Sequence, residues 1–304
     1  MNPNTFSALP RRAALACVLP ALLAAACTVP FPAPAPVSSP PAMLGQAEIA
    51  RIVAGPGRSD ADRANDLRRK PEQMLDFIGI RPGMTALDVS AGGGYTTELL
   101  ARAIGPTGAV YGQSRPVDPG RPAPTPAAPE GATHPGATPS PAAPAPAAPV
   151  RRPSPLVLAE RDQRMRAAGI AAAPIHAVVQ PFEDPVPAAL ADGGLDLATL
   201  IFNYHDLGFL GIDRARMNRA IFRALKPGGV FVIADHAGRP GTGISESGTL
   251  HRIEEAFLRH EVEQAGFRLV ADGRFLRNPN DPRDRNTPVP PQPKDQFVLK
   301  FVKP

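Results

Sequence analysis

Two short stretches of this sequence have residue types suited to chemistry, and each follows an apolar run. The first is Asp88-Val-Ser-Ala-Gly-Gly-Gly-Tyr95, in which an acid and three glycines follow Ala86–Leu87. Glycine is needed where backbone must approach a ligand closely, because any Cβ would fill that space. The helical pattern that begins at Thr96 would offer free N–H groups and a partial positive charge to an anionic group. The stretch therefore predicts a binding loop for a nucleoside-type cofactor.

The second stretch is Asn203-Tyr-His-Asp206, which follows the apolar run Leu195–Phe202. His205 is the candidate general base, because the unperturbed pKa of an imidazole lies near neutral. Asp206 would orient the imidazole, and Tyr204 would line the pocket of an acceptor molecule. A structural interpretation stays open, in which His205 and Asp206 cap local backbone and shape the loop.

Three further polar residues are expected on the same rim, at strand ends or at a helix start: Asp235, His236 and His251. Together with His205 and Asp206 they could ligate a divalent metal, because imidazole and carboxylate are common metal ligands. No tight ligand spacing supports a metal, so the sequence assigns no metal ligands. The same residues would serve equally well as backbone-orienting groups and as the start of a helix.

The pattern around these stretches alternates apolar runs with amphipathic segments. Strands are predicted at Thr85–Val89, Ala109–Tyr111, Ile175–Val179, Leu195–Phe202, Val230–Ala234, Arg268–Ala271 and Gln296–Val302. Helices are predicted at Asp62–Ile78 (with Leu67, Met74, Leu75 and Ile78 as its apolar face), Thr96–Ile104, Leu158–Ala168, from the cap Asp213 to Lys226-Pro-Gly-Gly229, and at His251–Ala265. This order predicts an α/β fold with a doubly wound, mostly parallel, Rossmann-like sheet. Seven strands are expected, the last one antiparallel, with helices on both faces and ligands beyond the strands' carboxyl ends.

The N-terminal residues predict export. Arg11-Arg12 precede the mildly apolar run Ala13–Ala26, which is too short to span a bilayer, so residues 1–26 are interpreted as a signal peptide. Leu23-Ala-Ala-Ala-Cys27 resembles the cleavage box of bacterial lipoproteins, in which the cysteine becomes the lipidated first residue; cleavage after Ala26 without lipidation stays open. A Pro/Ala-rich tether is expected over residues 27–57. These features predict a periplasmic location on the bacterial envelope, with a lipid anchor in the outer membrane.

The composition of the chain argues against several classes of protein. The chain has 304 residues, 40 prolines, two cysteines and a formal net charge of +5. With Cys17 inside the signal and Cys27 at the lipid, no disulfide framework, cysteine metal site or cysteine nucleophile is expected. No cluster of Lys and Arg interleaved with aromatic residues is present, which argues against a nucleic-acid partner. Segment 116–155, rich in Pro and Ala, is interpreted as a disordered insert that interrupts a domain of residues 58–304.

Several short strings, in order, resemble class I S-adenosylmethionine-dependent methyltransferases and, more narrowly, a family of exported bacterial methyltransferases. Besides the glycine loop and Leu225-Lys-Pro-Gly-Gly229, they are Asp62-Arg-Ala-Asn-Asp66, Arg69-Lys-Pro71, Arg81-Pro-Gly-Met84, Gly92-Gly-Gly-Tyr95, Asn203-Tyr-His-Asp206, Asp235-His236, His251-Arg-Ile253 and Asp295-Gln-Phe297. The resemblance covers residues 58–115 and 156–304. It implies S-adenosyl-L-methionine as the cofactor and methyl transfer to an acceptor, which we expect to be a small molecule.

The resemblance also implies which loop residues meet the cofactor. Gly92 and Gly94, with Gly93 between them, would face the methionyl part, and Asp88 would hold its ammonium directly or through water. Ser90 stands where such loops usually have glycine, and it is small enough to fit.

The resemblance also implies cofactor contacts at residues that follow later strands. Gln113 stands near the place where an acid commonly meets the ribose hydroxyls, and it carries no charge. Glu183 or Asp184 is the nearest candidate for the adenine amino group. Asn203, at the tip of the fourth strand, is a further candidate for contact with the cofactor.

The predicted export of the protein leaves two functions other than methyl transfer open. S-adenosylmethionine is made in the cytoplasm, so an exported enzyme has no obvious supply for repeated turnover. A lipid-anchored binding protein that retains the fold without catalysis is therefore a second hypothesis. A nicotinamide-dependent dehydrogenase is a third, which the glycine spacing, the terminal strand pair and the lack of a charged ribose partner suit less well.

Overall fold

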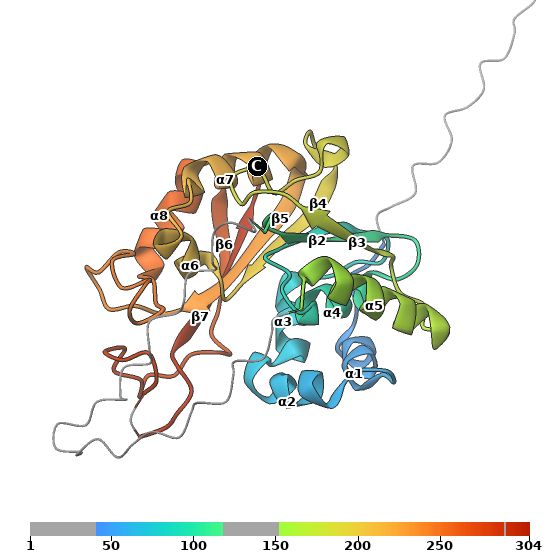
Figure 1. Ribbon diagram of the computed structural model, residues 1–304, viewed down its shortest axis with the longest axis horizontal. Helices are drawn as coiled ribbons and strands as arrows, with labels where there is room; N and C mark the ends of the chain where they lie inside the picture. Colours follow the sequence, from blue (N-terminus) through green and yellow to red (C-terminus); the bar gives the residue numbers. More distant parts are fainter. Residues whose placement is uncertain (1–40, 118–151, 289) are drawn as a thin grey trace, which may run out of the picture. The chain divides into compact units, whose positions relative to one another are not determined.

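A computed structural model describes residues 41–117, 152–288 and 290–304. Its centre is a sheet of seven strands in the order β3-β2-β1-β4-β5-β7-β6 (Figure 1). The strands are β1 (Thr85–Val89), β2 (Ala109–Ser114), β3 (Ile175–Val179), β4 (Leu195–Ile201), β5 (Leu225–His236), β6 (Arg268–Gly273) and β7 (Gln296–Val302). Strands β1 to β5 are parallel, and β7 runs antiparallel to both β5 and β6. The predicted doubly wound, mostly parallel sheet is confirmed.

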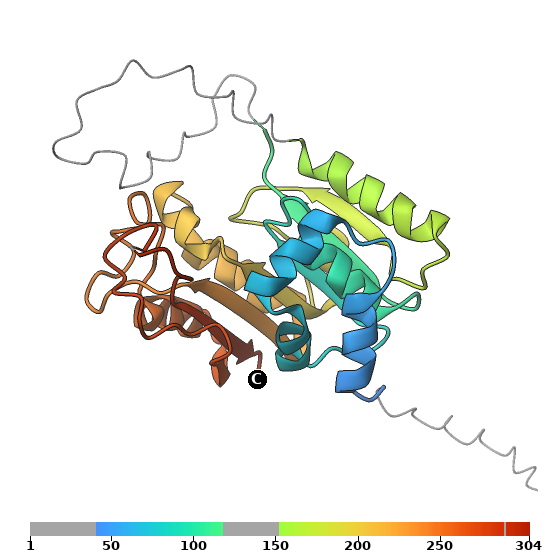
Figure 2. The same ribbon diagram turned by 90° about the horizontal axis from the view of Figure 1, so that it is seen from below.

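Helices cover both faces of this sheet. They are α1 (Gln46–Ala54), α2 (Asp60–Arg69), α3 (Pro71–Ile78), α4 (Tyr95–Ile104), α5 (Ser154–Ala167), α6 (Tyr204–Phe209), α7 (Arg214–Ala224) and α8 (Glu255–Gln264), with the 3₁₀ turn η1 (Ala188–Leu190). Figures 1 and 2 show the blue N-terminal helices on the same side as α4, whereas α7 and α8 lie on the other side.

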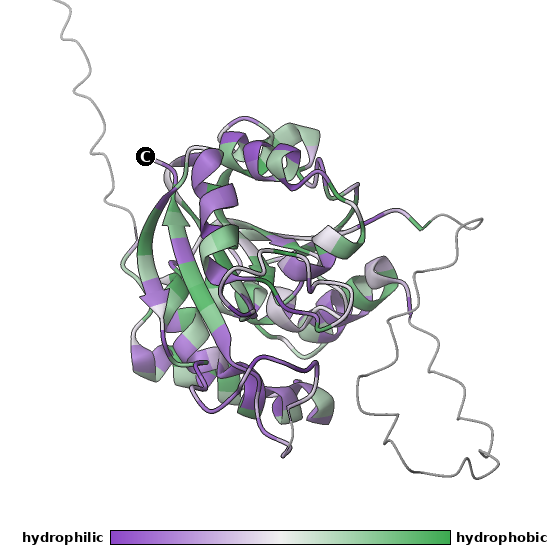
Figure 3. Cartoon of the chain, turned by 90° about the vertical axis from the view of Figure 1, so that its left-hand side faces the viewer, coloured by the Kyte–Doolittle hydropathy of each residue, from purple (hydrophilic) through white to green (hydrophobic). Residues whose placement is uncertain are grey.

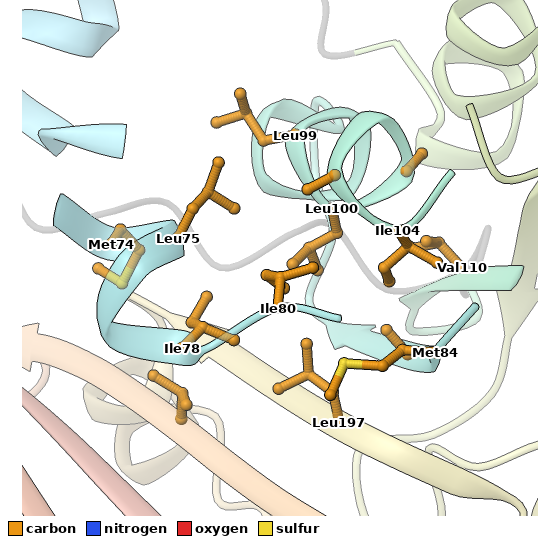
Figure 4. Packing of buried hydrophobic residues seen from close by; sticks show 14 of the residues in the cluster. Met74, Leu75, Ile78, Ile80, Met84, Leu99, Leu100, Ile104, Val110 and Leu197 are labelled. Atoms are coloured by element: carbon orange, nitrogen blue, oxygen red, sulfur yellow. The ribbon is translucent and has the colours of Figure 1, made fainter. Parts of the chain in front are cut away.

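Each face of the sheet has its own hydrophobic cluster. One cluster joins α1, α3, α4 and α5 to β1 and β2, and Figure 4 shows Leu75 and Ile78 of α3 packed toward Leu100 of α4. The other joins α6, α7 and α8 to β4, β5 and β7. Hydrophobic residues accordingly run along the strands in Figure 3. Two buried faces are what the near-continuous apolar strands require.

The predicted helix Asp62–Ile78 is wrong as a single element. The chain breaks at Lys70, whose φ is 45°, and Pro71 begins α3. Proline fits the first position of a helix because its missing N–H has no partner there in any case. Leu67, predicted for the apolar face, is 86% exposed, whereas Met74 and its neighbours on α3 are buried.

The boundary between tether and domain is also corrected. Helix α1 lies in the stretch predicted as tether, and its Ile49 and Val53 are buried in the first cluster. The domain therefore begins before residue 58, and chain contacts group Pro41–Pro304 in one unit. A helix of nine residues hidden among Pro- and Ala-rich sequence gave too short a pattern to separate from the tether.

Several element boundaries differ from those predicted, most of all at β5, which spans Leu225–His236 instead of Val230–Ala234 and includes the Lys226–Gly229 stretch assigned to the end of α7. Strand β2 runs on to Ser114, α5 begins at Ser154 inside the stretch assigned to the insert, and α8 begins at Glu255, so that His251 lies in the preceding loop. Asp213 caps α7 as predicted, accepting a hydrogen bond from the N–H of Arg216 at 2.8 Å.

Several predictions concern residues outside the described part of the chain. These are the signal peptide, lipidation at Cys27, the tether up to residue 40 and the insert from 118 to 151. Within the described residues, none of the helices has the length and apolarity to cross a membrane.

Candidate active site

The candidate site lies at the carboxyl edge of the sheet, where the chain reverses its direction of winding. Strand β1 has β2 on one side and β4 on the other, both parallel to it. Loops leaving β1 and β4 therefore diverge to opposite faces, and the edge between them, here called the crevice, is the usual ligand position in such sheets. A hydrogen bond spans it, since the hydroxyl of Ser90 donates to Oδ1 of Asn203 at 2.6 Å. The structure thus brings Ser90 and Asn203 together, and their contact with a cofactor stays a prediction.

The glycine loop after β1 exposes bare backbone toward open space. A Cβ on Gly93 would meet nothing within 4 Å, and one on Gly92 would come no closer than 3.8 Å to another atom. Gly94 differs, because its Cβ would lie 2.7 Å from Arg161 and 2.8 Å from Leu158 of α5. Gly92 and Gly93 therefore leave room for a ligand, whereas Gly94 is required for the packing of the α4 start against α5.

Ser90 adopts a backbone conformation that favours glycine. Its φ is 60°, and its N–H donates to Oε1 of Gln113 at 2.9 Å. The serine is tolerated because its hydroxyl and its N–H are both held in place. This explains physically why a small polar residue can occupy a position at which such loops usually have glycine.

Asp88 is turned into the protein and away from the crevice. It is 2% exposed, and its two carboxylate oxygens accept from the hydroxyls of Thr97 at 2.6 Å and Thr199 at 2.8 Å. Burial raises the pKa of Asp88 to about 6. The prediction that Asp88 itself holds a ligand ammonium is corrected: the carboxylate ties β1 to α4 and β4.

Gln113 is also corrected. It lies inside the longer β2, is fully buried, and uses its amide to brace the loop, since Oε1 accepts from Ser90 and Nε2 donates to the carbonyl of Gln180 at 2.7 Å. Both amide atoms are engaged and the side chain is fully buried, so Gln113 does not face a ribose. Glu183 and Asp184 lie half-buried in the turn after β3, and their contact with an adenine stays a prediction.

Arg69 is a site residue that sequence reasoning missed. Its guanidinium lies 4.3 Å from the ring centre of Phe202 and 5.8 Å from that of Tyr95, so it overlies the ends of both loops. Its buried Nε has no hydrogen-bond partner among the described residues. Burial lowers the pKa of Arg69 to about 10, with Arg68 adding to the effect. Because a cation that is partly removed from water is stabilised by an anionic partner, Arg69 is a candidate residue for binding an anionic group. The string Arg69-Lys-Pro71 was the only signal for it.

After β4, four side chains form a connected chain. Oδ1 of Asp235 lies 2.6 Å from Nδ1 of His205, and Nε2 of His205 lies 3.1 Å from Oδ1 of Asp206. Asp206 also lies 3.1 Å from Nδ1 of His251. His205 is 3% exposed and Asp235 is fully buried. The structure therefore brings together four of the five rim residues that the sequence grouped, through contacts that spacing could not reveal.

This arrangement argues against His205 as a free general base. A base needs a neutral nitrogen facing the acceptor, but both ring nitrogens of His205 face carboxylates. Although burial acts in the opposite direction, Asp235 and Asp206 raise the pKa of His205 to about 9. The same contacts hold the pKa of Asp206 below its usual value.

Tyr204 does not line an acceptor pocket. It is fully buried in the second hydrophobic cluster, and its hydroxyl donates to Glu261 at 3.0 Å and accepts from Asn218 at 2.8 Å. The sequence-based role is corrected. Tyr204 fixes α6 against α7 and α8, and thereby sets the position of His205.

Backbone strain is concentrated around the crevice. Of the five described non-glycine residues with positive φ, four lie here: Lys70, Ser90, Phe202 and His251. Such conformations cost on the order of 1–3 kcal/mol each and persist only where the surroundings enforce them. Their concentration at one edge of the sheet marks that edge as the functional one.

A cavity of 930 Å³ adjoins the crevice. His236, at the end of β5, forms part of its wall and stacks on Phe202 with ring centres 5.3 Å apart. The wall also has four cationic side chains and no carboxylate: Arg68, Lys70, Arg277 and Lys294. Burial lowers the pKa of Lys294 to about 8. Arg277 is paired with Glu255, so Arg68, Lys70 and Lys294 are the cations of this wall for which the structure shows no carboxylate partner among the described residues.

Comparisons with known proteins reveal likeness of fold only. No family model matches the chain, and no curated protein matches it. A SAM-dependent methyltransferase from Aquifex aeolicus is 17% identical, with a TM-score of 0.48 over 86% of this chain and 100% of that chain. A TehB-like SAM-dependent methyltransferase from Corynebacterium glutamicum is 18% identical, with a TM-score of 0.43 over 80% and 96%. The [4+2]-cyclase SpnF is 15% identical, with a TM-score of 0.48 over 88% and 99%.

Proposed function

We propose that this protein is an S-adenosylmethionine-dependent methyltransferase acting on a small anionic acceptor. The observation that carries the proposal is the carboxyl edge between β1 and β4, where open glycine backbone precedes Tyr95 and the guanidinium of Arg69 lies 5.8 Å from the Tyr95 ring centre. Adenosylmethionine has both matching parts, a carboxylate for the cation and a nucleoside that needs close approach to backbone.

Bound adenosylmethionine supplies a methyl group on an already activated sulfonium, so the protein has mainly to align the reactants. Arg69 would bind the carboxylate, which gives its buried guanidinium the charge-assisted partner it lacks. Gly92 and Gly93 would let the cofactor approach the loop. Asn203, held by Ser90 and in turn donating to Asp206 at 2.7 Å, keeps the acceptor-side loop opposite the cofactor.

The acceptor would occupy the adjoining cavity. Its volume of 930 Å³ lies within the range of about 300–1,000 Å³ typical of small-molecule sites. Arg68, Lys70 and Lys294, which have no carboxylate partner among the described residues, favour an anionic molecule, such as a carboxylate or phosphate ester. His236 lies on the wall of the cavity and against Phe202, which underlies Arg69, so an acceptor there would reach the cofactor.

We also propose that the protein works at the bacterial envelope, anchored through a lipid on Cys27. The proposal rests on the sequence Leu23-Ala-Ala-Ala-Cys27. Mass spectrometry of the N-terminal peptide from the native host should find a diacylglyceryl cysteine, and Cys27→Ser should move the protein from the membrane fraction to the soluble one. An unmodified mature N-terminus would refute the anchor without affecting the proposed reaction.

The proposed cofactor can be tested by calorimetry on the full chain in detergent. We expect adenosylmethionine and adenosylhomocysteine to bind and NAD not to bind. Gly93→Val should weaken binding at least ~100-fold, a loss of about 2.7 kcal/mol, because the side chain enters the space left for the ligand. Gly45→Val is the matched control, since Gly45 also has nothing within 4 Å of its Cβ position but lies at the start of α1.

Each outcome separates the hypotheses. If the wild-type chain binds neither nucleoside, or if Gly93→Val binds as the wild type does, the proposed cofactor site is wrong. Binding without transfer of a labelled methyl group to any small molecule of an envelope extract would favour the non-catalytic binding protein.

A further inference from the structure

Side chains of His205, Asp206 and His251 converge beside the cofactor crevice. Oδ1 of Asp206 lies 3.1 Å from Nε2 of His205 and 3.1 Å from Nδ1 of His251. These three atoms all lie within 4.8 Å of one another. They come from the start of α6 and from the loop before α8, so only the fold brings them together.

Asp235 decides which nitrogen of His205 faces the group. It lies 2.6 Å from Nδ1 of His205 and, as a carboxylate, can only accept the proton that this nitrogen carries. Nε2 is therefore the ring nitrogen of His205 that faces Asp206 and is placed to bind an ion.

We propose that His205, Asp206 and His251 together bind one divalent transition-metal ion, through Nε2, Oδ1 and Nδ1 respectively. Two imidazoles and one carboxylate are a ligand set that suits Zn²⁺, Fe²⁺, Co²⁺ or Mn²⁺. Ligand atoms about 2.0–2.2 Å from such an ion lie roughly 3.0–3.5 Å from one another in tetrahedral or octahedral geometry. The two 3.1 Å separations match that spacing, and the separation of the two nitrogens is at most 4.8 Å.

The surroundings hold each ligand in the orientation that binding requires. Asp235 fixes the His205 ring through Nδ1 and accepts the His205 backbone N–H at 2.8 Å. Asn203 donates to Oδ2 of Asp206 at 2.7 Å and leaves Oδ1 for the ion. Next to His251, the fully buried Arg252 pairs with Asp281 at 2.8 Å and anchors the loop. Hydrogen-bonded outer partners of this kind are typical of metal sites.

The geometry leaves coordination positions open. The side chains of Asp206 and His251 are 27% and 21% exposed, whereas that of His205 is enclosed. Asn203 connects Asp206 to Ser90 in the glycine loop, so the site faces the proposed cofactor. The role of the metal rests on the proposed function: an acceptor hydroxyl bound to the ion would release its proton to water near neutral pH. Acceptor activation would then need no free base, which His205 cannot provide.

Metal binding can be tested without reference to methyl transfer. The full chain, stripped with EDTA, is titrated with Co²⁺ by visible absorption and with Zn²⁺ by calorimetry. We expect one ion per chain and Co²⁺ bands that report nitrogen ligands. Asp206→Asn and His251→Gly should weaken binding by more than the ~10–100-fold typical of outer-partner changes. Glycine is chosen at 251 because the φ there is 50°.

His260→Ala is the matched control, because His260 lies exposed on α8, outside the group. Thermal unfolding checks that each variant folds. The proposal is overturned if the wild-type chain binds no ion, or if folded Asp206→Asn and His251→Gly variants bind as the control does. Gly93→Val should lose adenosylmethionine but keep the metal, which separates failure of this site from failure of the cofactor proposal.

Discussion

The loops after β1 and β4 meet at one crevice, yet they are built in opposite ways. After β1, the loop exposes backbone: Gly92 and Gly93 face open space. After β4, the loop presents side chains, His205 and Asp206, each held by partners from distant segments. The comparison teaches that a backbone site can be recognised from glycine spacing alone, whereas a side-chain site is defined by contacts that no local pattern encodes.

The largest expected effect contrasts two buried acids that support these loops from strands, Asp88 of β1 and Asp235 of β5. Asp235 accepts from three N–H groups, those of the His205 backbone and ring and of the His236 backbone. Asp235→Ala would leave them buried without an acceptor, so we expect the free energy of unfolding in urea to fall by ~3–5 kcal/mol. Asp88→Ala removes the acceptor of only two hydroxyls, which can rotate to other partners, so the free energy of unfolding should fall by ~1–3 kcal/mol. Equal losses of unfolding free energy in the two variants would show that the two acids do not differ in this way.

Asp88 should also make stability depend on pH. Because its folded-state pKa is raised from 3.8 to about 6, its protonated form favours folding. This contribution is fully present below pH 4 and is lost as the pH rises through 6. Relative to Asp88→Asn, the wild type should lose roughly 2–3 kcal/mol of unfolding free energy between pH 4 and pH 7. A constant difference across that range would show that Asp88 ionises normally.

Arg69 allows a test that involves both loops, because it belongs to neither of them but lies over Tyr95 after one and Phe202 before the other. Arg69→Met should weaken adenosylmethionine binding by ~10–100-fold, the value of a charged hydrogen-bonded pair. Without ligand, the variant should be as stable as the wild type or more so, because the unpaired buried cation is removed. Calorimetry and urea unfolding measure the two effects. Arg219→Met, an exposed site on α7, serves as the control.

The smallest expected effect concerns Tyr204. Tyr204→Phe removes the hydroxyl between Glu261 and Asn218, and should cost about 1 kcal/mol of stability. Methyl transfer should keep its KM, because the ring lies in the core. A clear rise in KM with unchanged stability would restore the acceptor-pocket role that the sequence suggested.

Much of the fold was predictable from sequence. Strands β1, β3 and β7 occur with the predicted bounds, because buried strands have unmistakable apolar runs. The pair α2 and α3 was predicted as one helix, because charged residues continue on both sides of the break at Lys70 and Pro71. Helix α1 was missed because its apolar face has few residues.

For the site residues, the sequence predicted positions better than contacts. Gly92, Gly93 and Asn203 are where the sequence placed them, at strand tips. Asp88 and Gln113 were given ligand contacts, but the structure uses them inside the protein. Strand position alone does not indicate whether a polar side chain turns toward the crevice or toward a neighbour, because that depends on partners such as Thr199 from another strand.

By itself, the sequence determined the order of strands and helices and the place of the glycine loop, since both follow from local periodicity and from the absence of a Cβ. Only the tertiary structure decided which polar atoms remain free. Both nitrogens of His205 are engaged, Arg69 lacks a partner at Nε, and His251 meets Asp206 across 45 positions of chain. These are properties of packing between distant segments, and hydrogen bonds or charges cannot be allotted until those segments are brought together.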